Sequence, residues 1–150
     1  MNINVPVVFL IVTLSACSTT TPIVDPYVDS QLLGYWTGSS GSYVDNTNWV
    51  IWRRPSGKFE ANFLVCRKGD IVASQREAGS WSHVDGSYKT RTEFLSNGYE
   101  SWFPDTPDKV YVEEYKVTNI SSTEFLYQNM HKNKKYKVIR VSRDYELQCM

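Results

Sequence analysis

Hydrophobic and polar residues alternate with a period of two along most of this chain. The clearest run extends from Tyr88 to Phe94. Every second position within it is charged: Lys89, Arg91 and Glu93. Successive side chains of a strand point to opposite faces of a sheet, so this run predicts a strand with one face in solvent. Similar runs recur between turn-forming residues, which is typical of a chain built from strands and hairpins.

Alternation and turn residues together predict eight strands. They lie near residues 34–41, 47–54, 58–66, 70–83, 87–95, 109–117, 123–130 and 134–142. One helical turn is expected before them, at residues 30–33, with Asp29 or Ser30 as its cap. Gly79 interrupts the long fourth strand, and a glycine inside a strand often marks a bulge.

This order of elements predicts an all-β fold. Twist accumulates across so many strands, and an open sheet would leave two unpaired edges. Pairing of the first strand with the last removes both edges, so we expect an eight-stranded antiparallel up-and-down barrel. The longest connection, residues 96–108, contains Pro104 and Pro107. It is expected either to cover one mouth of the barrel as a flap or to form an irregular surface loop.

Counting every second residue assigns a largely aromatic set of side chains to the barrel interior. The set comprises Trp49, Phe59, Phe63, Trp81, Tyr88, Thr90, Thr92 and Phe94. Aromatic residues make up 14% of the chain, enough to wall an apolar cavity that carries a few hydroxyl groups. Such a cavity would bind a small hydrophobic or amphipathic molecule. The same rings could instead fill the barrel completely, and the sequence leaves both interpretations open.

The N-terminal residues point to export from the cytoplasm. The apolar run at 5–14 is too short to span a bilayer, but it suits the apolar region of a secretory signal. The tetrad at 14–17, Leu-Ser-Ala-Cys, resembles a bacterial lipobox. That resemblance implies that residues 1–16 are a signal peptide and that acyl chains such as palmitate are attached to Cys17. An ordinary cleaved signal or an uncleaved anchor is the alternative.

The same resemblance implies how the chain is divided into segments and where in the cell the protein is located. Residues 17–30 are rich in Ser, Thr, Pro and Asp, and they are expected to form a flexible tether ahead of a barrel domain at 31–150. Ser18 resembles the residue type that directs enterobacterial lipoproteins to the outer membrane. We therefore expect a lipoprotein that is held in the outer membrane by its lipid anchor and faces the periplasm.

Two features resemble the lipocalin family of β-barrels. Gly34-Tyr35-Trp36 opens the first predicted strand, and Arg140 lies in the last one. In lipocalins a Gly-x-Trp triplet stands at this place, and its indole packs under an arginine of the final strand. The runs at 48–59 and 79–81 also look like the small bacterial lipocalin-like, or calycin-type, domains. The resemblance implies barrel closure through Trp36 and Arg140, where a cation over an indole contributes about 0.5–2 kcal/mol.

Cysteine and charge content bear on compartment and partners. With Cys17 assigned to lipid, Cys66 and Cys149 remain, and an oxidising periplasm would allow them to form a disulfide. Two separate thiols are the alternative. Lys plus Arg and Asp plus Glu number 16 each, so the net charge is zero and nucleic acid is not expected as a partner.

No residue pattern in the chain predicts catalysis. His83 and His131 lie at predicted turns and in none of the spacings typical of metal sites. Glu113 and Glu114 are adjacent, so they point to opposite faces of a strand. We expect a non-catalytic protein without metal or cofactor. The alternative to ligand binding is a protein-binding module with a filled barrel, such as an inhibitor or scaffold of a periplasmic enzyme, using loops such as 39–48 and 96–108.

Overall fold

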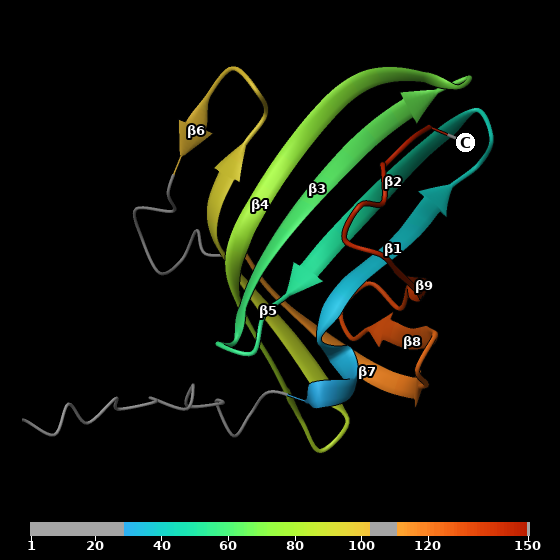
Figure 1. The fold of residues 1–150 in the computed structure, drawn as a ribbon. Coiled ribbons are helices and arrows are strands. Elements are labelled where there is room, and N and C mark those ends of the chain that lie inside the picture. Colours follow the sequence, from blue (N-terminus) through green and yellow to red (C-terminus); the bar gives the residue numbers. More distant parts are fainter. Residues whose placement is uncertain (1–28, 103–110, 150) are drawn as a thin grey trace, which may run out of the picture.

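The computed structural model describes residues 29–102 and 111–149, which form an all-β barrel (Figure 1). Eight antiparallel strands close it in up-and-down order. A short helix, η1 (Ser30–Leu32), precedes the strands. The strands are β1 (Gly34–Gly41), β2 (Asp45–Arg53), β3 (Lys58–Arg67), β4 (Asp70–Val84), β5 (Ser87–Ser96), β6 (Ser101–Trp102), β7 (Tyr111–Ile120), β8 (Glu124–Asn129) and β9 (Lys135–Val141).

The pairing of β1 with β9 closes the barrel. Trp36 lies opposite Arg140 in this pairing. The other strands pair in chain order, and β5 pairs directly with β7. The predicted eight-stranded barrel is therefore confirmed. The short strand β6 was not predicted; it pairs with the end of β5 and lies outside the ring of eight.

The connection after β5 begins as a tight turn. The side-chain oxygen of Asn97 accepts hydrogen bonds from the backbone N–H groups of Tyr99 (3.0 Å) and Glu100 (2.9 Å), and the chain then returns as β6. Residues 103–108 of the predicted flap lie outside the described residues, so closure of a flap over the barrel stays a prediction. Cys17, the signal peptide and most of the predicted tether lie outside them as well.

A bulge interrupts the pairing of β4 with β5, next to Gly79 as predicted. Thr92 lies opposite Gly79 and Phe94 lies opposite Ala78, so no residue of β4 stands opposite Glu93 in the register. A Cβ on Gly79 would stand 1.9 Å from the backbone oxygen of Arg91, so only glycine allows the two strands to approach this closely.

This bulge corrects one of the predicted interior positions. The extra residue, Glu93, shifts the alternation of β5 by one, and a shift of one residue moves a side chain to the opposite face. Leu95 is therefore buried and lines the barrel interior. Phe94, which was expected inside, does not line it, so that prediction was wrong.

Trp36 and η1 fill one end of the barrel, which we call the closed end. This end also carries the turns at 53–58, 84–87 and 120–124. Trp36 is fully buried, and its indole Nε1 donates to the backbone oxygen of Leu32 at 3.0 Å. The ring of Phe125 meets the indole edge-on at 6.2 Å between centroids. These contacts place a fully packed layer at this end of the interior.

Arg140 covers that layer from the outside. Its guanidinium carbon lies 4.2 Å from the centroid of the Trp36 ring. The guanidinium also donates to three backbone oxygens at 2.6 Å, those of Gln31, Leu33 and Ser122. Arg140 thus ties η1 to the last strand, with the packing that the lipocalin resemblance implies.

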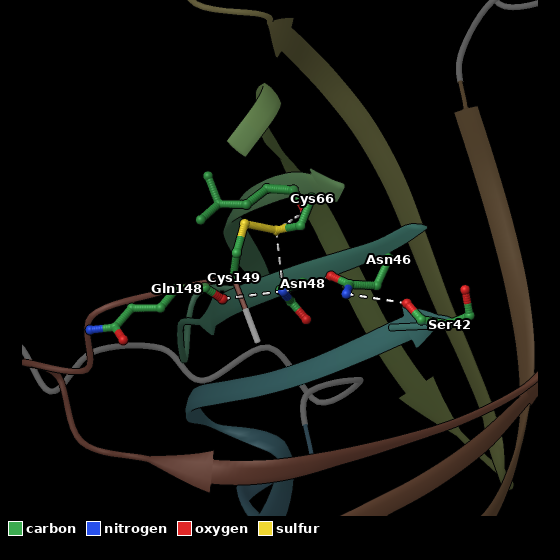
Figure 2. Close-up of a disulfide and its surroundings, with 7 residues drawn as sticks. Ser42, Asn46, Asn48, Cys66, Gln148 and Cys149 are labelled. Atoms are coloured by element: carbon green, nitrogen blue, oxygen red, sulfur yellow. Dashed lines mark hydrogen bonds between the residues drawn. A yellow bond between two sulfur atoms is a disulfide. The ribbon is translucent and has the colours of Figure 1, made fainter. Parts of the chain in front are cut away.

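The C-terminal tail, residues 142–149, returns along the outer surface of the barrel. Figure 1 shows this red segment crossing in front of β1 and β2. Cys149 forms a disulfide with Cys66, with a Cα–Cα distance of 5.7 Å. Figure 2 shows Asn48 beneath the bond, where its amide nitrogen donates to the backbone oxygen of Gln148 at 3.1 Å. Asn48 and Cys66 are both buried by this tail.

Candidate functional site

The barrel interior contains a cavity of about 510 Å³. All eight strands of the ring contribute side chains to its wall. Inward positions recur at every second residue, as on β2, where Thr47, Trp49, Ile51 and Arg53 all face the cavity. A volume between about 300 and 1,000 Å³ is usual for sites that bind small molecules.

Six of the eight residues assigned to the interior line the cavity: Trp49, Phe59, Phe63, Tyr88, Thr90 and Thr92. Trp81 does not. It is buried in the core beside Tyr88, with 6.4 Å between the ring centroids, and contributes to packing rather than to the cavity wall. Phe94 does not line the cavity either, because the bulge at Glu93 turns its side chain to the opposite face of β5.

Four tyrosines form a connected aromatic surface on one side of the cavity. They are Tyr88, Tyr115, Tyr127 and Tyr136. Neighbouring rings lie 5.0–6.1 Å apart between centroids, in both stacked and edge-to-face arrangements. Burial, followed by the charges of neighbouring groups, raises the pKa of Tyr115 and Tyr127 far above the ordinary value of 10. Like any tyrosine at neutral pH they carry a protonated hydroxyl group that can donate a hydrogen bond, and the raised pKa extends this state to more alkaline pH.

Arg53 stands at the cavity floor, the part next to the closed end. Only 1% of the residue is exposed. Its Nε donates to the Tyr88 hydroxyl at 3.0 Å. The guanidinium carbon also lies 4.9 Å from the centroid of the Tyr88 ring and 5.4 Å from that of Phe125. Sequence analysis missed this residue, although it continues the inward phase of Trp49 and Ile51.

Two carboxylates face the cavity farther toward the other end of the barrel. Burial raises the pKa of Glu77, opposed by hydrogen bonds from Gln75 (2.5 Å) and Thr92 (3.2 Å), and the charge of Glu113 raises it further. Glu113 itself pairs with Lys132 at 2.8 Å. Its sequence neighbour Glu114 bonds Ser87 and Lys89 instead, as expected for adjacent residues on opposite faces.

The end of the barrel opposite the closed end, which we call the mouth, is less packed. It carries the connections at 41–45, 67–70, 96–101 and 129–135. Tyr111 lines the cavity and is 59% exposed, so the cavity reaches solvent at this end. Tyr43 and Tyr99, on two of the mouth connections, are 76% and 98% exposed.

The two histidines do not form a reactive centre with the cavity. His83 lies in β4 rather than in a turn, half-buried, with its Nδ1 2.9 Å from the Asp29 carboxylate. His131 lies in the turn after β8, as expected. Within residues 29–102 and 111–149, no group of three or more His, Cys, Asp or Glu side chains is placed to hold a metal ion.

No protein-family model matches this chain, and no curated protein does either. The part of the chain that the structure describes contains no helix long and apolar enough to cross a membrane. The closed, eight-stranded antiparallel barrel is consistent with a lipocalin-like fold.

Proposed function

We propose that this protein is a periplasmic lipoprotein, anchored in the outer membrane, whose barrel binds a small hydrophobic or amphipathic molecule without converting it. The cavity of about 510 Å³ is the observation that carries this proposal. Eight of the twenty residues that line it are aromatic and three are aliphatic, and the other nine carry polar or charged side chains. This combination is typical of sites that bury an apolar body and orient it by a few hydrogen bonds.

The energetics favour an apolar ligand. Each Å² of apolar surface removed from water contributes about 25 cal/mol, and the connected rings offer such surface without having to move. Trp49 belongs to this wall and packs edge-on against Tyr136, with 5.9 Å between centroids. A ligand in the cavity would contact its indole and change its fluorescence.

Tryptophan fluorescence titration of the barrel domain with dodecanoate and with a lysophospholipid tests the proposal. We expect saturable changes with at least one of them, and lipid extraction of protein purified from its host should release a small molecule. An Ala61→Phe variant places a ring on the cavity wall and should weaken binding about tenfold or more. Ser74→Phe is the control, because Ser74 is exposed and lies on the opposite face of β4 from Gln75 and Glu77, which line the cavity.

The lipid anchor has a separate test. Cells expressing the full chain and fed radiolabelled palmitate should label the protein, and Cys17→Ser should abolish the label. Ser18→Asp, which leaves Cys17 in place, is expected to retain it while changing the membrane in which the protein fractionates. Labelling of the Cys17→Ser variant would contradict the anchor without affecting the proposal of ligand binding.

A protein-binding module is the second candidate function. Tyr43 and Tyr99 favour it, because both are largely exposed near the mouth and aromatic side chains often dominate protein interfaces. A photo-crosslinking residue at position 99 should then capture one specific periplasmic partner. The same probe at Lys116, an exposed position on the barrel wall, serves as the control.

A further inference from the structure

Arg53 is an incompletely satisfied cation at the cavity floor. It lines the cavity and is almost completely buried. Its Nε bonds the Tyr88 hydroxyl, but its Nη1 has no hydrogen-bond partner among the described residues. A buried guanidinium with an unused N–H group is unfavourable unless something compensates it.

The surroundings of Arg53 add positive charge and no anion. Arg140 approaches the closed end from outside, close enough that Arg53 contributes to lowering its pKa, after burial as the larger cause. Arg140 donates to backbone oxygens. Within residues 29–102 and 111–149, neither arginine forms an ion pair with a carboxylate. The floor therefore lacks a negative group of its own.

Tyr88 supplies a second donor at the same place. Its hydroxyl accepts the bond from Arg53 Nε, and a phenol that accepts one hydrogen bond can still donate its own hydrogen. Arg53 and Tyr88 both line the cavity, and together they hold two neighbouring donors, an N–H and an O–H group, for which no acceptor is present among the described residues. An acid group is the ligand chemistry that accepts bonds from both and neutralises the guanidinium.

The charges elsewhere in the cavity set the orientation of such a ligand. Ile51, Ala61 and Glu77 lie side by side on β2, β3 and β4. Ile51 is one inward position nearer the mouth than Arg53, so Glu77 also lies one position nearer the mouth than the floor. Glu113 also faces this part of the cavity. Both carboxylates would repel an anion placed beside them. Lys134, at the mouth, is the competing cation, with its Nζ 5.5 Å from the ring of Tyr136.

We propose that the natural ligand is an amphipathic acid, bound with its anionic head on Arg53 and Tyr88 at the floor and its apolar tail directed to the mouth. This inference rests on the proposed function, because it specifies the ligand class of the same cavity. From Arg53 to Thr47 along β2 the cavity wall extends over about 20 Å of strand, enough for a tail of medium length.

Three probes with the same twelve-carbon tail test the head group: dodecanoate, dodecyl phosphate and dodecan-1-ol. We expect the wild-type protein to bind at least one of the two anions ten times or more tighter than the alcohol, and the better anion identifies the head. Equal affinity for all three would overturn the inference while leaving the proposed function intact. If the protein binds none of the three probes and no lysophospholipid, the proposed function itself is contradicted.

Variants then locate the head group. Arg53→Met should reduce the preference for the anion to about twofold or less and change the alcohol affinity by less than about threefold. Arg53→Lys should retain an intermediate preference, because it keeps the charge and loses the planar fork. Tyr88→Phe should weaken anion binding about three- to tenfold. Near-ultraviolet circular dichroism checks that each variant is folded, and the preference is a ratio within one variant.

Two matched control variants test whether Arg53, rather than another cation, causes the preference for an anionic head group. Arg54→Met makes the same change at the next residue, whose side chain stacks over Trp52 and pairs with Glu60 away from the cavity. It should leave the preference unchanged. Lys134→Met should do so as well. If Lys134→Met removes the preference while Arg53→Met keeps it, the head lies at the mouth and the inference is wrong.

Discussion

The closed end and the mouth of this barrel are held by different kinds of interaction. At the closed end, a fully buried indole packs beneath Arg140, which bonds the backbone of η1. Near the mouth, large aromatic side chains are exposed, and the nearby outer surface is fastened by the Cys66–Cys149 disulfide. The comparison indicates that stability is concentrated at one end, which leaves the other end free to admit a ligand.

Removal of the indole should have the largest effect. Trp36→Ala is expected to reduce the free energy of unfolding by about 3–5 kcal/mol, because it leaves a large hole in a packed layer. Urea denaturation measures the change. Trp52→Ala is the control from the neighbouring strand: Trp52 is only partly buried and stacks on Tyr35 at 5.4 Å, so a clearly smaller loss is expected. Equal losses would contradict the concentration of stability at the closed end.

Removal of the disulfide tests the other fastening. Cys149→Ala combined with Cys66→Ala should cost about 2–4 kcal/mol of unfolding free energy, since the bond joins residues 83 apart in sequence. Hydrogen exchange should become faster at Asn48 and its neighbours under the C-terminal tail and stay unchanged around Trp36. With a reducing agent present, wild type and variant should have the same stability. Faster exchange at both ends would show that the two fastenings are not independent.

Arg140→Met removes the cover of the closed end while keeping a similar length of side chain. We expect a loss of about 1 kcal/mol, from the cation over the indole and from hydrogen bonds that are open to solvent. Lys137→Met, on the same strand, removes an exposed ion pair with Glu124 and should change stability by less than about 0.5 kcal/mol. Thermal unfolding of both variants distinguishes the two.

Glu77→Gln should have the smallest effect, and its sign depends on pH. The pKa of Glu77 is raised in the folded state, so ionisation opposes folding above that pKa. Stability due to this group rises as the pH falls through the raised pKa and levels off below the ordinary value of 4.5. The variant should therefore be slightly more stable than wild type at pH 7, with no difference below about pH 4. Denaturation midpoints across this range provide the measurement.

The strands could be predicted from sequence because their alternation is strong and turn residues separate them. The prediction for Phe94 failed because the sequence alternates without interruption from Tyr88 to Phe94, whereas in the structure Glu93 forms a bulge that shifts the side chains after it to the opposite face. Only the pairing with β4 reveals that bulge, and the signal was Gly79 on the partner strand rather than anything in β5.

The polar part of the cavity was missed for a different reason. A charged residue in an alternating run predicts a solvent-facing position, yet Arg53 and Glu77 line the cavity, each in phase with inward neighbours. Strict phase counting from Trp49 through Ile51 would have found Arg53. The course of the C-terminal tail over Asn48 had no comparable signal, because residues 142–149 carry no periodic pattern.

The bond between Cys66 and Cys149 also determines what happens when the backbone is cut. β4 to β9 all lie within the covalent ring that it closes. A protease that hydrolyses one peptide bond inside this ring opens the chain without releasing a fragment. The nicked protein migrates as one species on a non-reducing gel and separates into two pieces only after reduction. A cut between Cys66 and Cys149 therefore does not detach one part of the barrel from the other.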